Sequence, residues 1–185
     1  MDRRKVLKIS SAFLGYSLAG GTVAAVMGGC KATAEAKPAD LNLFDDKTYH
    51  LINELTELII PATDTPGAKD ANVVSYIHDR LKNFTTEAER EKAFEDLKLF
   101  DTKSMETFDK DFLDLDLSQQ TEILKKMSVE AQQNEEHIFN MLREETIVGF
   151  FTSELGATEV LRFDPIPGVY NGCMEYVEGE AAWAL

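Results

Sequence analysis

Apolar residues recur at spacings of three and four along most of the chain, and strictly alternating patterns are scarce. That spacing places side chains on one face of a helix, so it predicts α-helices rather than strands. The first helix is expected to begin near Asp45 and Asp46, whose negative charge favours a helix start, and to end before Pro61. Its spaced apolar residues are Leu51, Ile52, Leu55, Leu58 and Ile59.

Four further helices are predicted after the turn-forming segment 61–71. The second follows Asn72, and the third begins at Thr86 and Glu89, which have capping-box spacing. Ser118 is expected to cap the fourth, and the fifth is expected to span residues 129–154. The residues expected on the apolar faces are, for the second to the fifth helix in turn, Val73, Ile77, Leu81 and Phe84; Phe94, Leu97, Met105, Phe108 and Phe112; Ile123, Leu124 and Met127; and Ile138, Met141, Leu142, Val148 and Phe151.

The helical pattern stops after Gly156 and a short turn. Residues 162–185, RFDPIPGVYNGCMEYVEGEAAWAL, combine two prolines and three glycines with several bulky apolar side chains. Such a segment is irregular yet apolar, so it must lie against its own helices or against another chain. The predicted fold is therefore all-α: a compact domain of about five helices over residues 43–185, with a long irregular tail from about residue 157.

The first 29 residues have the order of an export signal: basic, then apolar, then small. Residues 2–8, DRRKVLK, resemble a twin-arginine signal through Arg3, Arg4, Leu7 and Lys8. That resemblance implies export through the translocase that moves folded proteins. The alternative is an ordinary secretory signal that happens to hold two arginines.

Cys30 follows small residues at the end of this stretch, in an arrangement that resembles a lipobox. The resemblance implies lipidation of Cys30 and a membrane-anchored lipoprotein on the periplasmic side; the alternative is that Cys30 is a bystander. Residues 30–42 are small and polar and suit a flexible tether.

Charge narrows the range of partners. The 185 residues carry a net charge of −14, and removal of residues 1–29, with four basic side chains and one acidic, would lower it to −17. Nucleic acid is excluded as a partner because its phosphates need a positive surface. Anionic lipid would be repelled as well, so a membrane link needs a lipid on Cys30 or a partner protein. Cys173 would then be the remaining thiol, and we expect it to be buried or covered.

No catalytic motif stands out. A haem-attachment motif, a glycine-rich phosphate loop, a serine nucleophile elbow and a zinc-protease motif are all absent from the sequence. His50 and Glu54 share a helix face, but a surface pair is the preferred interpretation, and His78 is expected to be an ordinary helix residue. Asn134 stands where a di-iron site would need glutamate before His137. We therefore expect no catalytic, cofactor-binding or metal-binding residues in this chain.

Two proline-containing segments, residues 61–68 and 164–168, consist of residue types that form turns, and we expect both to be stiff. They are interpreted either as self-capped connectors or as rigid epitopes for a partner, since stiffness lowers the entropy cost of docking. The residues assigned to a partner interface are Thr63, Asp64, Thr65, Pro66 and Gly67, then Asp164, Pro165, Ile166, Pro167 and Gly168, with Tyr170 and Cys173.

Three motifs in this order resemble the gluconate 2-dehydrogenase subunit 3 family: IIPATDTPGA at 59–68, FTSELGAT at 151–158 and LRFDPIPGVYNGC at 161–173. The resemblance implies the small subunit of a membrane-associated sugar or polyol dehydrogenase, without a cofactor of its own. It implies a large flavoprotein partner of the glucose–methanol–choline type that holds FAD, and a multihaem cytochrome c as a further subunit in many cases. The small subunit is then expected to carry the export signal for both chains and to aid maturation.

Two other functions are kept as alternatives. One is a free-standing exported lipoprotein that acts as a binding or scaffold module. The other is an enzyme in its own right, which would act through Asp64 or through acidic clusters such as Asp109 with Asp111.

Overall fold

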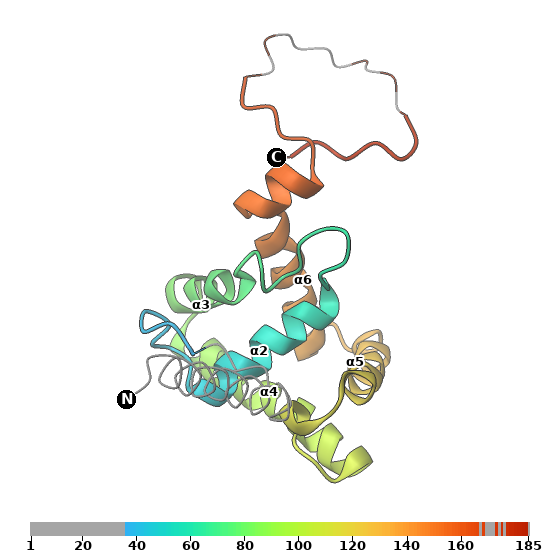
Figure 1. The fold of residues 1–185 in the computed structure, drawn as a ribbon. Helices are drawn as coiled ribbons and strands as arrows, with labels where there is room; N and C mark the ends of the chain where they lie inside the picture. Colours follow the sequence, from blue (N-terminus) through green and yellow to red (C-terminus); the bar gives the residue numbers. More distant parts are fainter. Residues whose placement is uncertain (1–35, 167, 169–172, 174, 176, 185) are drawn as a thin grey trace, which may run out of the picture. The chain divides into compact units, whose positions relative to one another are not determined.

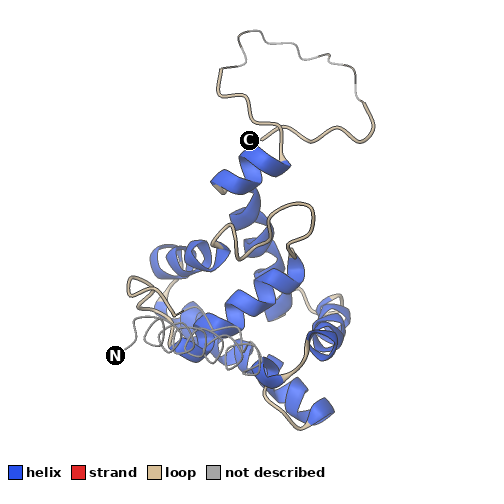
Figure 2. Cartoon of the chain, viewed as in Figure 1, coloured by secondary structure: helices blue, strands red, loops and turns tan. Residues whose placement is uncertain are grey.

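The computed structural model describes residues 36–166, 168, 173, 175 and 177–184. Within this part of the chain the regular elements are helices, joined by loops, and strand pairing is limited to one isolated bridge in the tail (Figures 1 and 2). The all-α prediction is confirmed. The elements are α2 (Asp46–Ile59), α3 (Val73–Phe84), α4 (Glu87–Phe108), the 3₁₀ turn η1 (Phe112–Asp114), α5 (Leu117–Ala131), α6 (Ile138–Phe151) and the π-helical turn η2 (Gly156–Val160).

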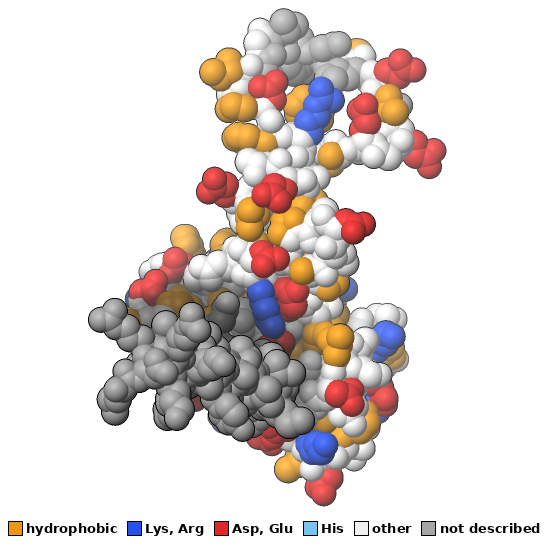
Figure 3. Space-filling model, in the orientation of Figure 1, with side chains coloured by type: hydrophobic (Ala, Val, Ile, Leu, Met, Phe, Trp, Pro, Cys, Tyr) orange, Lys and Arg blue, Asp and Glu red, His pale blue; other side chains and the backbone are white. Residues whose placement is uncertain are grey.

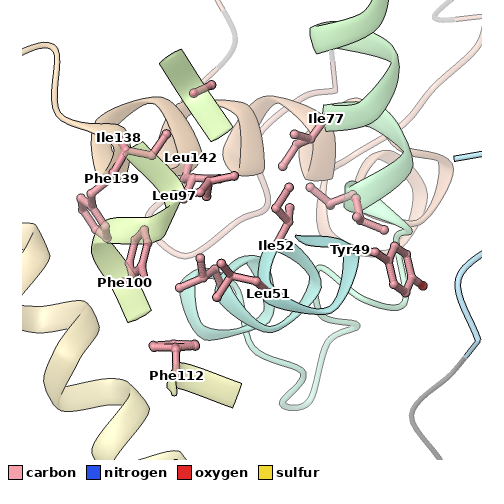
Figure 4. Close-up of a cluster of buried hydrophobic side chains, with 14 of the residues drawn as sticks. Tyr49, Leu51, Ile52, Ile77, Leu97, Phe100, Phe112, Ile138, Phe139 and Leu142 are labelled. Atoms are coloured by element: carbon pink, nitrogen blue, oxygen red, sulfur yellow. The ribbon is translucent and has the colours of Figure 1, made fainter. Parts of the chain in front are cut away.

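The core lies where α2, α3, α4 and α6 meet, and α5 and η1 close it at one end (Figure 4). Ile52, Ile77 and Leu142 come from three of these helices and are almost completely buried. The rings of Phe100 on α4 and Phe112 on η1 meet edge to face, with centroids 5.9 Å apart. Burial of these faces is the main stabilising term for the helices, because isolated helices of this length are marginal in water.

Two predicted helix starts agree with the structure. The Asp45 carboxylate accepts a hydrogen bond from the Thr48 N–H at 2.7 Å, and hydrogen bonds from the Thr48 side chain and backbone lower the pKa of Asp45. Thr86 and Glu89 form both halves of the capping box that begins α4. The predicted start of the fourth helix is wrong: α5 begins after Asp116, which forms a capping box with Gln119, and not after Ser118.

Two predicted helix lengths are wrong as well. Helix α4 ends at Phe108, because Asp109 has a left-handed backbone (φ 54°), so Phe112 lies outside it. The predicted helix over 129–154 is interrupted at residues 132–137, and Val129 belongs to α5. The Asn140 side chain donates 3.0 Å hydrogen bonds to the carbonyls of Ala131 and Asn134 and so stabilises the turn between α5 and α6.

Residues before α2 pack on the domain. Leu41 is 2% exposed and Phe44 is equally buried, so the core includes the last residues of the segment predicted as a tether. His78, predicted to be an ordinary helix residue, is buried and holds this segment: its Nε2 accepts from the Leu43 N–H at 3.4 Å, and its ring packs edge to face on Phe44. The predicted signal 1–29, with Arg3, Arg4, Leu7 and Lys8, lies outside the described residues, as does Cys30.

Candidate partner interface

The loop between α2 and α3 is organised by the Glu57 carboxylate. Oε1 accepts a hydrogen bond from the Ala62 N–H and Oε2 accepts one from the Lys69 N–H, both at 2.9 Å. One side chain thus joins both ends of the loop. The Ala68 N–H also donates to the Ile60 carbonyl at 2.9 Å, which closes the base of the loop.

Gly67 lies at the tightest point of this loop. A Cβ atom there would lie 2.5 Å from the Ala62 nitrogen and 2.7 Å from the Glu57 carboxylate oxygens, so only glycine fits. The Gly67 N–H donates to the Asp70 carboxylate at 2.9 Å. Gly67 and Ala68 are buried, whereas residues 61–65 are exposed. The loop is therefore a self-capped connector that also presents Thr63, Asp64 and Thr65 to solvent.

The second motif begins where α6 ends. Ser153 Oγ donates to the Phe150 carbonyl at 2.6 Å and accepts from the Gly156 N–H at 3.0 Å. Gly156 is buried against that same carbonyl, and a Cβ atom there would overlap it. The chain continues as the π-helical turn η2, which ends at Val160.

The tail then leaves large apolar side chains exposed: Phe163 is 52% exposed, Ile166 82%, Val177 49% and Trp183 45%. Figure 3 shows hydrophobic and acidic side chains at the surface of the tail, at the top of the view. The Asp164 carboxylate accepts from the Ile166 N–H at 3.1 Å, so this part of the motif is a small turn of its own. The tail was predicted to lie either on the chain's own helices or against another chain. Its described apolar side chains are left uncovered by the chain's own helices.

Among the other tail residues predicted at an interface, Pro165 and Gly168 are exposed. Pro167 and Tyr170 lie outside the described residues. Cys173 is exposed, so the prediction that it is buried is wrong for this chain by itself. Its cover by a partner stays a prediction.

A second apolar surface follows the helix that leads into the tail. Ile147, Val148 and Phe151 share one face of α6 and are each more than a third exposed, although Val148 and Phe151 were expected to face inward. The opposite face holds the buried Leu142, Thr146 and Phe150. A helix that is apolar on both faces is usually covered on both. The sequence pattern missed this because periodicity does not reveal which apolar face meets the core.

Beside this apolar surface, α3 and α6 meet at three polar side chains, Tyr76, Arg80 and Glu145. Gly149 of α6 allows the Tyr76 ring to approach, since a Cβ atom there would lie 2.6 Å from that ring. Burial, together with the nearby Glu145 carboxylate, raises the pKa of Tyr76. The Arg80 guanidinium lies 3.4 Å from that carboxylate and 5.3 Å from the centre of the Phe84 ring, which is itself 72% exposed although it was expected to face inward.

The candidate catalytic and metal groups have structural partners instead. Glu54 pairs with Lys69 at 2.8 Å, and His137 Nδ1 accepts from the Phe139 N–H at the start of α6. Asp111 binds Lys47 at 2.9 Å, and hydrogen bonds from Lys47 to Asp101 and Asp111 raise the pKa of that lysine. In the described part of the chain, three or more His, Cys, Asp or Glu side chains nowhere gather as a metal site would require. No described helix is both long enough and apolar enough to cross a membrane.

Comparison with known proteins gives one match. A family profile described as gluconate 2-dehydrogenase subunit 3 matches residues 46–168, which run from the start of α2 through η2 into the tail. The matched span includes the Glu57-centred loop, Gly156 and the Asp164 turn. Neither the curated proteins nor the solved structures gave a match.

Proposed function

This chain belongs to the gluconate 2-dehydrogenase subunit 3 family, and from that membership we propose that it is the non-catalytic small subunit of a flavin-dependent sugar, polyol or gluconate dehydrogenase. In this proposal the large subunit is a glucose–methanol–choline-type flavoprotein that holds the FAD, and a multihaem cytochrome c accepts the electrons. The small subunit contributes a folded surface and an export signal.

The observation that carries the proposal is the apolar surface left uncovered within the family match. Ile147, Val148 and Phe151 on α6 and Phe163 and Ile166 in the tail are exposed in this chain. Contiguous exposed apolar surface usually marks a site of protein association. By contrast, Asp116 and His137 cap helices, and Asp111 is an ion-pair partner of Lys47. The arrangement therefore favours a subunit over an enzyme.

The proposed export route follows from the cofactor chemistry. A flavoprotein that receives FAD in the cytoplasm has to cross the membrane in a folded state. A twin-arginine signal with Arg3 and Arg4 could serve both chains if they associate before export. Lipidation of Cys30 would then anchor the complex on the periplasmic side, since a body with this negative charge is repelled by anionic lipid.

The test replaces Arg3 and Arg4 together by lysine and follows the flavoprotein in cell fractions. We expect the flavoprotein to remain in the cytoplasm, while a conservative change at an exposed residue of α5, Lys125→Arg, leaves its export intact. Unchanged export of the flavoprotein by the signal variant would refute the escort role. Replacement of Cys30 by alanine should release an intact complex from the membrane fraction.

The second candidate, a free-standing exported lipoprotein that binds or scaffolds other molecules, makes a different prediction. It predicts a monomer without a flavoprotein in mild detergent extracts. The exposed apolar surface favours the first candidate, because a monomer would leave that surface in water.

A further inference from the structure

The two ends of the tail are joined to each other. The Arg162 N–H donates to the Ala182 carbonyl at 2.7 Å, and the Ala184 N–H donates to the Arg162 carbonyl at 3.0 Å. These bonds form a parallel bridge between Arg162 and Trp183. The Arg162 guanidinium also lies 4.2 Å from the centre of the Trp183 ring and 3.9 Å from the Glu180 carboxylate. We call this set of contacts the clasp.

The clasp closes the tail into a loop, because the segment 177–184 returns to the point where the tail leaves η2 (Figure 1). Without it, residues 163–182 would be a long chain end with many conformations, and docking would have to order all of them at once. With the clasp, both arms of the loop start from one point. The exposed Phe163 and Ile166 lie on one arm and Val177 lies on the other.

Charge identifies the kind of surface that this loop fits. Asp164, Glu175, Glu178 and Glu180 are exposed along it, whereas Arg162 is its single basic residue and is engaged in the clasp. An apolar loop edged by carboxylates complements an apolar patch edged by lysine or arginine. A second copy of this chain is disfavoured as the occupant, because each copy carries a net charge of −14.

We propose that the Arg162–Trp183 clasp is a positioning device that holds two arms of the tail, residues 162–166 and 177–184, together as a docking loop for a basic-edged apolar surface of the large dehydrogenase subunit. This inference rests on the proposed function for its occupant. It goes further in assigning the recognition chemistry and in giving Arg162 and Trp183 a role. Neither residue acts on substrate; both act by holding the loop.

Trp183 is the one tryptophan of this chain, which supplies a direct probe. The full-length chain, labelled with 5-fluorotryptophan, is titrated with the purified glucose–methanol–choline-type flavoprotein subunit of the same organism. Binding is measured by biolayer interferometry at low and high salt, and ¹⁹F NMR follows Trp183. The variants are Arg162→Ala, Arg162→Lys and Trp183→Ala. Lys126→Ala is the matched control, because it removes a cation from the face of another aromatic ring, that of Phe108, outside the tail.

We expect Arg162→Ala and Trp183→Ala to raise the Kd at least tenfold with unchanged helicity by circular dichroism. Arg162→Lys, which keeps the charge but not the planar stacking, should give an intermediate effect. The Lys126→Ala Kd should stay within twofold of wild type. In the free chain, Arg162→Ala should move the ¹⁹F resonance toward the value of the unfolded chain, and added salt should weaken wild-type binding.

Three outcomes would overturn the inference. Equal Kd values for wild type and the clasp variants would reject the clasp while leaving the proposed function standing. A wild-type chain that does not bind the flavoprotein at all would reject the proposed function and the docking loop together. Concentration-dependent dimers that dissociate on Ile166→Asp substitution would assign the loop to a second copy instead.

Discussion

Glu57 is the side chain on which the α2–α3 loop depends most, and its replacement offers a sharp test. Its carboxylate accepts two backbone hydrogen bonds, from Ala62 in an exposed setting and from Lys69 in a partly buried one. Hydrogen bonds to charged groups contribute about 1.5–3 kcal/mol each when water cannot replace them. Water can replace the Glu57 carboxylate at the exposed Ala62 N–H, so the bond to Ala62 contributes less, about 0.5–1 kcal/mol.

Glu57→Ala should therefore lower the free energy of unfolding by about 2–4 kcal/mol, the sum of the two bonds. Glu57→Gln keeps one acceptor oxygen, which can serve Lys69, and should lower it by about 1 kcal/mol. The matched control is Glu54→Gln, one turn earlier on α2, which removes only the half-exposed ion pair with Lys69 and should cost under about 1 kcal/mol.

The measurement is urea unfolding of the chain from residue 30 onward, followed by circular dichroism, with binding to the proposed flavoprotein partner measured in parallel. Loss of the loop should weaken binding through the exposed Thr63, Asp64 and Thr65 even where the helices remain folded. If Glu57→Ala were no more destabilising than Glu54→Gln, the claim that one carboxylate organises the loop would be refuted.

Three other substitutions test the packing. Leu41→Ala should lower the free energy of unfolding by about 2–5 kcal/mol in urea titrations, because it opens a cavity under the segment before α2; a cost below 1 kcal/mol would place Leu41 outside the core. Gly156→Ala should cost about 1–3 kcal/mol in the same assay, since its Cβ would overlap the Phe150 carbonyl; an unchanged free energy of unfolding would contradict that close approach. Asp45→Ala should cost about 1 kcal/mol at pH 7 through loss of the α2 cap. The pKa of Asp45 is lowered in the folded chain, so its contribution is complete above the unfolded pKa and is lost as pH falls through the folded one. The difference between Asp45→Ala and wild type should therefore shrink below about pH 4; a constant difference would contradict the assigned cap.

The sequence by itself determined the features that depend on near neighbours. Thr86 and Glu89 are three residues apart, so their reciprocal hydrogen bonds could be inferred from spacing, as could the end of α2 before Pro61. The family motifs were recognised for the same reason, since they are short continuous segments, and the family match is confirmed.

Residue spacing alone could not determine every helix boundary, because some segments hold more than one residue suited to cap a helix. Asp116 and Ser118 are both good capping residues, and only the structure shows that Asp116 takes the role, because its box with Gln119 is complete. Likewise residues 129–154 were predicted as one helix, and the turn that interrupts it depends on the Asn140 side chain, which donates to the Ala131 carbonyl at the end of α5.

Tertiary structure alone decided which apolar residues were left over for a partner. Periodicity groups Ile77 with Phe84, yet Ile77 is buried and Phe84 is exposed, because burial depends on which neighbouring helix lies opposite each one. The closure of the tail by Arg162 and Trp183 joins residues 21 positions apart, through contacts that no local pattern encodes. Local physics specifies helices and caps from a few adjacent residues, whereas an exposed surface is defined by what the rest of the fold does not cover.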